Sequence, residues 1–379
     1  MVILIAPNSF KNSLMADEVA EAIEIGLKQS GLKGKFIKFP IGDGGDYTSH
    51  LICKHLKGEM KSMQVEGAYL RKTQANFALI HRGKTAVIEV AETSGFKSIN
   101  NKVKNPLDSS TKGLGQVIRS QIESGIKNFI ICLGGSATVD GGIGMLQALG
   151  LEFKDKSDHT IQAMPGNFDQ VEKIDCSNFE KLVKVCKFTV LCDVDNKLLG
   201  KEGAAEVFGP QKGAKPADVE QLESFLSKFD KLSKKVLGKS MNSIQGGGAA
   251  GGLGAAFAVY LKADLQHGAS YFCELTKFDQ ELSKADLLIT AEGSIDQQSL
   301  DGKAPITVAE KAKKLHIPCI GLAGRVPLEI LPKLQEYFSL LLPIANQPES
   351  LEESMKHSKA NLIRTAGQIG RFIYRKSNN

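Results

Sequence analysis

The stretch NFIICLGGSATVDGGIGMLQALG, residues 128–150, decides the fold because it contains three kinds of segment in a fixed order. Its apolar start, Asn128–Cys132, is typical of a strand that is covered on both faces. A loop rich in glycine follows, and apolar residues then return in Gly144–Gly150 with the character of a helix. A strand, a loop and a helix in this order form the repeating unit of α/β folds.

The same order recurs along the chain. The apolar run Val2–Ala6 leads into a polar loop, and apolar residues spaced as on one face of a helix follow up to Leu27. Further apolar runs that lead into polar or glycine-rich loops lie at residues 36–41, 189–192, 287–290, 318–322 and 339–342. Residues 64–92 differ, because they indicate two or three strands joined by short turns such as HRGK. We therefore expect an α/β protein with a largely parallel sheet and, in the middle of the chain, a mixed sheet.

Length, composition and charge narrow the class of protein. The chain has 379 residues, which favours two domains, and 42% of them are hydrophobic, enough for a sizeable core. The net charge of +6 comes from lysines spread along the chain, without the basic clusters or aromatic signatures of nucleic-acid-binding proteins. No apolar stretch reaches the roughly 18 residues of a membrane span. We expect neither a nucleic-acid partner nor a membrane partner.

Cysteine and histidine usage bears on compartment and metal sites. The seven cysteines form no CxxC pair and several lie in apolar runs, which is typical of buried free thiols in a reducing compartment. The seven histidines show no HExxH or comparable spacing, so a histidine-based metal site is not expected. The apolar part of the start, MVILIAPNSF, is too short for the core of a signal peptide. We expect a cytoplasmic protein.

The loops that follow the apolar runs combine glycine with Asp, Ser or Lys. They include PNSFKNS, GDGGD, GGSATVDGG, DVDN and AEGSID. Ligands bind outside the carboxyl ends of the strands in open α/β sheets, so these loops indicate one shared anionic or metal-bound ligand. In GGSATVDGG, backbone N–H groups can converge on a phosphate, and the next helix adds its positive end. Asp140 in this loop is alternatively an ordinary helix N-cap.

Two known nucleotide-binding motifs do not fit. The P-loop pattern GxxxxGK[ST] fails at GKT (83–85) and GKS (238–240), because the required first glycine is Ala78 and Ser233 respectively. The stretch GGGAAG (246–251) matches GxGxxG, yet it follows no clear apolar strand and no acidic residue lies about 20 positions further on. We interpret it as a glycine-rich loop that feeds a tightly packed helix, with a second phosphate-binding loop left open.

Carboxylates and lysines near the predicted strand ends suit phosphoryl transfer. This reaction needs Mg²⁺ held by one or two carboxylates, a base for the attacking hydroxyl, and cations for the transferred group. The candidates are Asp43, Asp46, Asp193, Asp195, Glu292, Asp296, Lys11 and Lys303. Taken singly, each carboxylate is alternatively a turn or cap residue, and Lys303 is alternatively a solvated side chain beside the first turn of a helix.

Taken together, the motifs are similar to those of one family. They are APNSFKNSL (6–14), PIGDGGD (40–46), GGSATVDGGIGML (134–146), CDVDNKLLGKEGAAEVFGPQKGA (192–214), GGAAGGLGAA (247–256) and EGSIDQQSLDGKAP (292–305). In this order they resemble the type-1 glycerate kinases of bacteria over essentially the full chain. The resemblance implies ATP-dependent phosphorylation of glycerate with Mg²⁺, commonly at the 2-hydroxyl in bacterial members.

The resemblance also implies two α/β domains with the active site in the cleft between them. One is flavodoxin-like, with a parallel sheet built from both chain ends, residues 1–66 and 291–379. The other, residues 67–290, is inserted into the first and contains the mixed sheet.

The motif positions carry residue assignments for a reaction that works mainly by positioning and charge neutralisation. We assign Asp193 as the general base toward the acceptor hydroxyl, with Lys11 and Lys303 as the catalytic cations. The residues assigned to substrate binding are Ser9, Lys11, Asp43 and Asp195. The residues assigned to the phosphates of ATP are Gly134, Gly135, Ser136 and Asp140. The residues assigned to Mg²⁺ are Glu292 and Asp296.

The chain departs from the family pattern at several positions, three of them in loops on the substrate side. The departures are Asn8 for Asp, Asp46 for Glu, Tyr47 for Gly, Lys197 for Pro and Ser294 for Arg. Ser294 lacks the bidentate grip that Arg has on a carboxylate or phosphate. A kinase for another small hydroxy acid therefore stays open, as does a non-catalytic ligand-binding regulator on the same scaffold. The sequence leaves both a monomer and a homodimer open.

Overall fold

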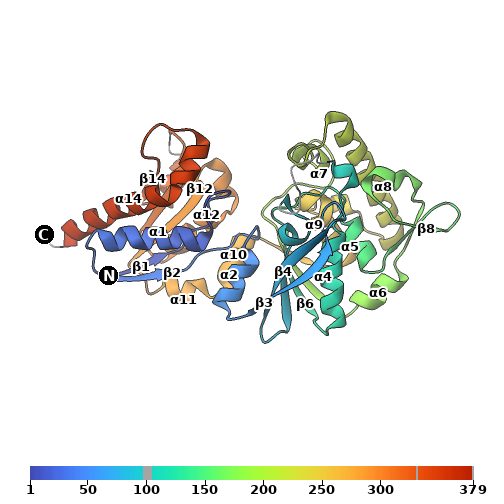
Figure 1. Cartoon of the computed structure of the whole chain (residues 1–379), viewed down its shortest axis with the longest axis horizontal. Coiled ribbons are helices and arrows are strands. Elements are labelled where there is room, and N and C mark those ends of the chain that lie inside the picture. The colour runs from blue at the N-terminus through green and yellow to red at the C-terminus, as the bar shows by residue number, and fades with distance from the viewer. Residues whose placement is uncertain (97–104, 330–331, 378–379) are drawn as a thin grey trace. The chain divides into compact units, whose positions relative to one another are not determined.

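The chain forms two compact units. The computed structural model describes residues 1–96, 105–329 and 332–377. Unit 1 comprises residues 1–43 and 269–379, and unit 2 comprises residues 44–268. Both units combine helices with a sheet (Figure 1), as the α/β pattern predicts. The domain limits inferred from the sequence, 1–66 with 291–379 and 67–290, stay a proposal about independently folding domains.

The sheet of unit 1 is wholly parallel, as predicted. Its strands are β1 (Val2–Ile5), β2 (Lys35–Lys38), β12 (Leu287–Ser294), β13 (Cys319–Arg325) and β14 (Leu340–Pro343). Their order is β2-β1-β12-β13-β14, and every neighbouring pair is parallel. Counted in chain order this is 2-1-3-4-5, the order of flavodoxin-like sheets. The prediction of a flavodoxin-like sheet built from both chain ends is confirmed.

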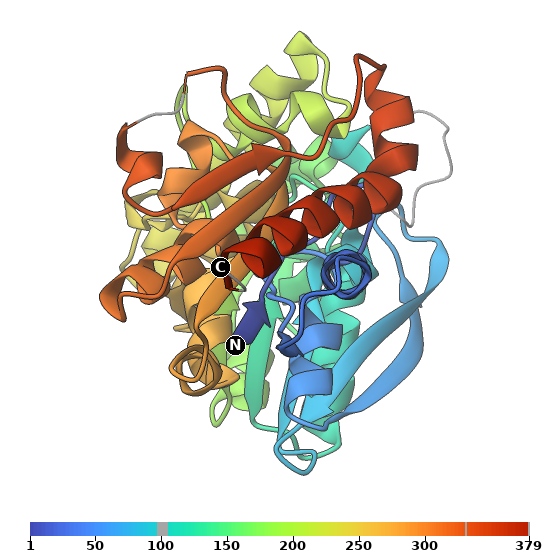
Figure 2. The ribbon, with the colours of Figure 1, turned by 90° about the vertical axis from the view of Figure 1, so that its left-hand side faces the viewer.

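Helices cover the sheet of unit 1. They are α1 (Ala16–Gln29), α10 (Gly268–Leu275), α11 (Phe278–Leu282), α12 (Ala304–Lys314), α13 (Pro332–Gln335), α14 (Leu351–Ser377) and the 3-10 helix η6 (Gln297–Asp301). Figures 1 and 2 show α1 and α14 side by side. A Cβ on Gly26 of α1 would lie 2.2 Å from the carbonyl oxygen of Ile363 in α14. Glycine therefore lets the two helix backbones approach closely.

The main sheet of unit 2 is mixed, as predicted for the middle of the chain. Its strands are β3 (Glu59–Glu66), β4 (Lys72–Ile80), β5 (Thr85–Glu89), β6 (Asn128–Cys132), β10 (Lys187–Leu191) and β11 (Asp264–Gln266). Their order is β11-β10-β6-β5-β4-β3. Strands β5, β6, β10 and β11 run parallel, and β3 and β4 are antiparallel to their neighbours. The turn HRGK joins β4 to β5, with φ of 53° at His81 and 61° at Arg82.

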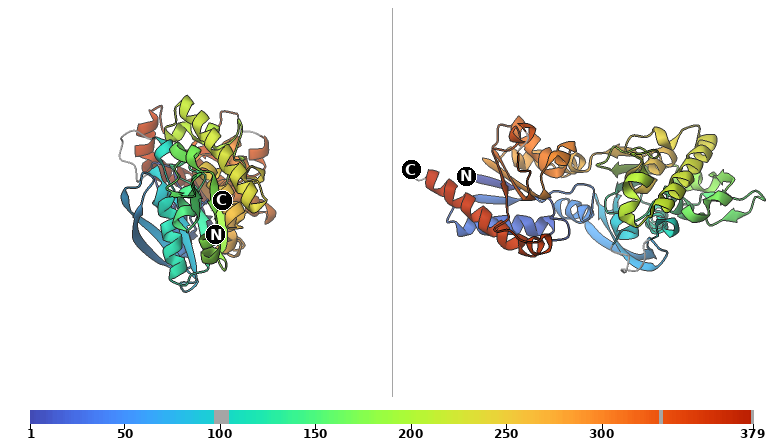
Figure 3. Two further views of the ribbon diagram at one scale, coloured as in Figure 1. Left: turned by 90° about the vertical axis from the view of Figure 1, so that its right-hand side faces the viewer. Right: turned by 90° about the horizontal axis from the view of Figure 1, so that it is seen from above.

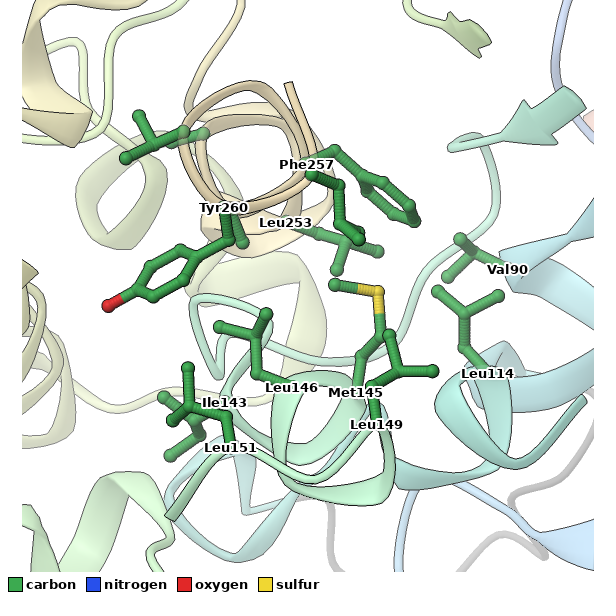
Figure 4. Close-up of a cluster of buried hydrophobic side chains, with 14 of the residues drawn as sticks. Val90, Leu114, Ile143, Met145, Leu146, Leu149, Leu151, Leu253, Phe257 and Tyr260 are labelled. Atoms are coloured by element: carbon green, nitrogen blue, oxygen red, sulfur yellow. The ribbon is translucent and has the colours of Figure 1, made fainter. Parts of the chain in front are cut away.

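Several helices pack on this sheet and enclose the core of unit 2. They are α2 (Thr48–His55), α3 (Val90–Ser94), α4 (Lys112–Glu123), α5 (Ile143–Ala148), α6 (Ser177–Val183), α7 (Ala204–Phe208), α8 (Pro216–Leu237) and α9 (Ala249–Tyr260). Among the described residues of unit 2 there are also the 3-10 helices η2 (Pro106–Asp108), η3 (Pro165–Gln170), η4 (Pro210–Lys212) and η5 (Met241–Ser243). Figure 4 shows Met145 and Leu146 of α5 among Leu253, Phe257 and Tyr260 of α9. The apolar residues that follow the glycine-rich loop therefore fix that loop to the core.

Unit 2 contains a second, small sheet that the sequence pattern does not predict. It consists of β7 (Glu152–Lys154), β8 (Thr160–Ile161) and β9 (Lys173–Asp175), in the order β8-β7-β9. Figure 3 shows β7 and β8, in green, projecting from unit 2. Such short strands contain too few residues for an alternating pattern to stand out.

Two further expectations concern thiols and membranes. All seven cysteines are free and most of them are buried, as predicted. Among the residues that the structure describes, no helix is both long and apolar enough to cross a membrane.

Candidate functional site

The predicted substrate and metal residues of unit 1 follow three neighbouring strands at their carboxyl ends. Ser9 and Lys11 follow β1, Asp43 follows β2, and Glu292 and Asp296 lie at the end of β12 and just beyond it. In a 2-1-3-4-5 sheet the strand order reverses between the first and third strands, here β1 and β12. Ligands of open α/β sheets bind at this reversal. The topology therefore brings these residues to the position where unit 1 is expected to hold a ligand.

Asn8 organises the end of β1. Its side-chain amide donates a hydrogen bond to Asp43 Oδ2 at 3.0 Å, and its Oδ1 accepts the backbone N–H of Ser9 at 2.6 Å. Its own backbone N–H donates to the carbonyl of Ala291 at 2.8 Å. Asn8 is 5% exposed, so its amide is held in place. Asn8 is thus a neutral, buried donor that orients Asp43.

Glu292 is a buried carboxylate of unit 1 whose pKa is raised. The sequence pattern predicts it in a loop, whereas β12 continues to Ser294 because Glu292 and Ser294 pair with Ala323 and Arg325 of β13. Glu292 is 8% exposed, and its Oε2 has no hydrogen-bond partner within the described ranges. Burial raises the pKa of Glu292 to about 7, and the positive charge of Lys303 opposes that rise.

Other charged residues predicted for the site in unit 1 also shift the pKa of Glu292. Asp43 and Asp296 raise the pKa of Glu292, and Lys11 lowers it. Ser294 Oγ donates to Asp296 Oδ2 at 2.8 Å, so this serine orients a carboxylate. Lys303 directly precedes α12, whose first turn contains Pro305. The charged residues predicted for the site in unit 1 thus influence one another electrostatically.

A metal ion in unit 1 would be bound by few protein side chains. Within residues 1–96, 105–329 and 332–377, no cluster of three or more His, Cys, Asp or Glu side chains is placed to hold a metal ion. Mg²⁺ usually needs only one or two carboxylates, because water and substrate phosphates complete its shell. A buried carboxylate oxygen that lacks a partner is costly unless a donor or a cation satisfies it. Glu292 Oε2 therefore fits an ion of this kind.

Asp193 in unit 2 is held by the backbone. It follows β10, and its Oδ1 accepts the N–H of Gly268 at 2.7 Å. Its side chain is half-buried, and Asp195, two residues further on, is exposed. The two carboxylates that the sequence treats as a pair therefore have different surroundings, and this contact with Gly268 fixes Asp193 alone.

The glycine-rich loop after β6 lies against a second glycine-rich segment. Gly134 donates its N–H to the carbonyl of Gly44 at 3.0 Å. A Cβ on Gly134 would lie 2.4 Å from the Cα of Gly45, and a Cβ on Gly135 would lie 2.2 Å from Asp46 Oδ1. Gly135 also has a φ of +75°. GGSATVDGG and GDGGD, two of the loops singled out in the sequence, are thus in direct contact, and their glycines allow it.

Asp140 has the structural role of a cap. Its side chain is fully buried and accepts hydrogen bonds from Thr111 N, Thr111 Oγ1, Gly142 N and Gly144 N, at 2.7 to 3.2 Å. Burial raises its pKa, and these hydrogen bonds oppose the rise. The positive end of α5, which the sequence pattern offers to a phosphate, is therefore occupied by this carboxylate. Direct contact of Asp140 with a nucleotide stays a prediction.

The stretch GGGAAG has a packing role, as interpreted from the sequence. Gly251 is positioned so that a Cβ would lie 2.2 Å from the carbonyl oxygen of Thr138, and its own carbonyl accepts the N–H of Gly141 at 2.9 Å. Small residues at the start of α9 thereby support the loop that contains Ser136.

Sequence reasoning missed two buried charged residues in unit 2. Lys212, within the VFGPQKGA motif, is 3% exposed and donates to Ser136 Oγ and to the Thr138 carbonyl. Glu89, at the end of β5, is 2% exposed and accepts the N–H groups of Tyr47 and Ser49 at the start of α2. For Glu89 the available signal was its place at the end of an apolar run, like the other strand-end carboxylates.

We expect Glu89 to contribute to a pH dependence of the stability of the protein. Burial raises its pKa to about 7 from an ordinary value of 4.5. Between these pH values the folded protein keeps a proton on Glu89 that the unfolded chain has released, so the contribution of Glu89 to stability falls as pH rises. The slope reaches about 1.4 kcal/mol per pH unit, and the contribution is complete below pH 4.5 and lost above pH 7.

We expect Glu89→Gln to remove the contribution of Glu89 to the pH dependence of stability, because the glutamine side chain does not titrate. The free energy of unfolding of the variant minus that of the wild type should increase from pH 5 to pH 7 and then level off, measured by urea denaturation. Glu206→Gln, at an exposed glutamate, is the matched control and should follow the wild type. Parallel curves for wild type and Glu89→Gln would contradict the assignment.

A separate hollow of about 810 Å³ lies elsewhere in unit 2. Lys112, Arg119, Gln147 and Phe153 are among the residues that line it, and none of the predicted site residues does. It lies at the carboxyl end of α5, whereas the glycine-rich loop lies at the amino end of that helix. Its volume alone assigns it no part in the predicted chemistry.

Comparison with known proteins identifies relatives over almost the whole chain. The profile of the Glycerate kinase family matches residues 3–374. Glycerate kinase from Bacillus cereus is 39% identical over 369 residues, which cover 97% of each chain. Glycerate 2-kinase from Escherichia coli is 37% identical over 369 residues, again 97% of each chain.

A solved structure agrees with these relatives. A protein from Salmonella typhimurium LT2, provisionally named glycerate kinase 2, superimposes with a TM-score of 0.85 at 35% identity, and the match covers 100% of both chains. The two-unit α/β architecture is therefore shared along the full chain. With the ordered motifs, the flavodoxin-like sheet and these matches taken together, the chain belongs to the glycerate kinase family.

Proposed function

We propose that the protein transfers the γ-phosphoryl group of ATP to a hydroxyl of glycerate and gives 2-phosphoglycerate, with Mg²⁺ as cofactor. The observation that carries the proposal is the match to proteins named glycerate kinases over 97% of this chain. The geometry of the two units supports it, because each predicted residue group lies at the carboxyl ends of parallel strands, where α/β enzymes bind ligands.

The residues of unit 1 supply the groups that a small hydroxy acid needs. The carboxylate of glycerate is anionic, and Lys11, Ser9 and Asp43 are the proposed binding residues for its carboxylate and hydroxyl groups. Asn8 orients Asp43 through the hydrogen bond of 3.0 Å. Lys303 neutralises charge on the transferred phosphoryl group, as cations do in other phosphoryl transfers.

Glu292 and Asp296 are the proposed ligands of Mg²⁺. The partnerless Glu292 Oε2 is the observation that favours this role. The ion would offset the negative charge of the phosphates during transfer. Ser294 would hold Asp296 in place through its hydrogen bond of 2.8 Å.

The residues of unit 2 supply the base and the phosphate-binding loop. Asp193 accepts the proton of the attacking hydroxyl while the oxygen of that hydroxyl forms a bond to the γ-phosphorus and the bond from that phosphorus to ADP breaks. Asp195 is the proposed exposed contact to substrate. Gly134, Gly135 and Ser136 bind the phosphates of ATP, and Asp140 acts on this loop by capping α5.

Phosphorus NMR of the reaction product tests the proposal. We expect wild-type protein with ATP, Mg²⁺ and glycerate to produce ADP and one phosphate monoester with the coupling pattern of 2-phosphoglycerate, in which a methine proton neighbours the phosphorus. The pattern of 3-phosphoglycerate, with a methylene group, would overturn the site of phosphorylation. Omission of Mg²⁺ with a chelator present should abolish ADP release.

A panel of hydroxy acids in the same ADP-release assay separates the alternatives. Asn8, Tyr47 and Ser294 depart from the family pattern and motivate the search for another acid. Faster turnover of such an acid than of glycerate would identify a different kinase. Absence of ADP with every acid, despite measurable ATP binding, would favour a non-catalytic regulator.

A further inference from the structure

Lys212 is a lysine buried beneath the glycine-rich loop of unit 2. It ends η4 and is 3% exposed. Its Nζ donates to Ser136 Oγ and to the carbonyl oxygen of Thr138, each at 2.8 Å. Both acceptors belong to the loop, two residues apart, so one side chain fixes the path of the loop between them. Lys212 thus links the VFGPQKGA motif to GGSATVDGG.

The surroundings of Lys212 leave its charge only partly compensated. Burying an ammonium is costly unless charges or hydrogen bonds offset it. Both acceptors of Lys212 are neutral oxygens. The field of Asp140 favours the charged form, yet that carboxylate already accepts four hydrogen bonds from Thr111, Gly142 and Gly144. The ring of Phe208 lies 6.0 Å from Nζ and adds a weak cation–π contact.

The loop around Lys212 also holds polar atoms that the protein itself does not satisfy. Thr138 Oγ1 and Ser94 Oγ are buried and have no hydrogen-bond partner in the part of the chain that the structure describes. The carbonyl of Ser94 accepts the N–H of Ala137, so both hydroxyls belong to this loop or to the segment bonded to it. Buried hydroxyls without partners are uncommon, and a bound ion or water is one explanation for them.

The geometry points to Lys212 as the positioning residue of the phosphate-binding loop: its two hydrogen bonds set the shape of the loop at Ser136 and Thr138, and its positive charge draws the phosphates of ATP to that loop. This inference rests on the proposed function, which places ATP phosphates at Gly134, Gly135 and Ser136.

The protonation chemistry of lysine agrees with this role. A neutral amine still has two N–H groups, enough for both hydrogen bonds, so the third proton can be gained or lost while the loop keeps its shape. Burial lowers the pKa of Lys212 to about 7. An anionic phosphate at the loop would favour the charged form, so nucleotide binding should be accompanied by proton uptake at pH 8.

Steady-state kinetics of Lys212→Met test the inference, with Lys215→Met as the matched control at an exposed lysine of the same segment. We expect Lys212→Met to raise the KM for ATP about tenfold at pH 7, with little change in the KM for glycerate. Above pH 7 the wild-type KM for ATP should rise toward tenfold per pH unit, and the variant should lack this rise. Lys215→Met should match the wild type in both respects.

A purely structural role predicts a different result. Lys212→Met would then lower the unfolding temperature while the folded protein kept the wild-type KM for ATP and its pH profile, and this outcome would overturn the inference. If Lys212→Met does not fold, Ser136→Ala removes one acceptor and keeps the charge. It should raise the KM for ATP and retain the pH dependence above pH 7, and a pH-independent KM would count against the role of Lys212.

Calorimetry on the wild type needs no variant. ADP binding at pH 8, measured in two buffers that differ in ionisation enthalpy, should show uptake of close to one proton. Binding without proton uptake would overturn the inference. Because this measurement uses binding alone, it still decides the role of Lys212 if no hydroxy acid is phosphorylated and the proposed function fails.

Discussion

Asp193→Asn should lower kcat by a factor on the order of 10² or more, because an amide cannot accept the proton of the attacking hydroxyl. The substitution keeps the size of the side chain. The amide oxygen that it introduces can still accept the N–H of Gly268, which Asp193 Oδ1 accepts at 2.7 Å. Gly268 therefore keeps its hydrogen-bond partner, and the loss should appear in turnover rather than in folding.

The measurement is ADP release at saturating ATP and glycerate, together with nucleotide binding and thermal unfolding. We expect binding and unfolding temperature near those of the wild type. Asp264→Asn makes the same chemical change at an exposed position in β11 and should leave kcat unaltered. Near-normal turnover in Asp193→Asn would remove Asp193 from the role of base and direct attention to the carboxylates of unit 1.

The fold could be predicted from the sequence wherever an element carried its own pattern. The strand at Val2–Ala6 and the helix that ends near Leu27 can be predicted, because the spacing of apolar residues distinguishes a strand from a helix over these lengths. The end of β12 could not be predicted from the sequence. Glu292 and Ser294 are strand residues through their pairing with β13, about 30 residues further along the chain. Pairing between distant segments leaves no local trace in AEGSID.

Some residues of the candidate site could likewise be predicted from the sequence, and others could not. Strand-end carboxylates such as Asp43, Asp193 and Glu292 are visible from the sequence because the carboxyl ends of parallel strands collect ligand-binding residues. Lys212 has no such signal, because a lysine is usually exposed. Its acceptors in the folded protein, Ser136 and Thr138, lie 76 and 74 residues earlier in the chain. Asp140 had two interpretations, and besides its local contacts with Gly142 and Gly144 it accepts two hydrogen bonds from Thr111, in a distant segment.

Gly134→Ala should destabilise the protein by about 3 kcal/mol or more and weaken ATP binding. The added Cβ would lie 2.4 Å from the Cα of Gly45 and 3.2 Å from the carbonyl oxygen of Gly44. Both obstacles are backbone atoms, which cannot rotate away as a side chain can. Relief therefore requires the GDGGD segment to separate from the loop, and this strains or breaks the hydrogen bond from Gly134 N to Gly44 O.

Gly125→Ala separates this steric effect from the general cost of replacing a glycine. Gly125 has a φ of +90°, and a Cβ there would meet no atom within 4 Å. Its replacement should cost only the strain of a left-handed backbone, about 1 kcal/mol, and leave the KM for ATP unchanged. Urea denaturation and ADP release decide between the two variants. Equal losses of stability, with a wild-type KM for ATP in Gly134→Ala, would mean that the Gly44–Gly45 backbone yields freely and that its contact with the loop does not shape the phosphate site.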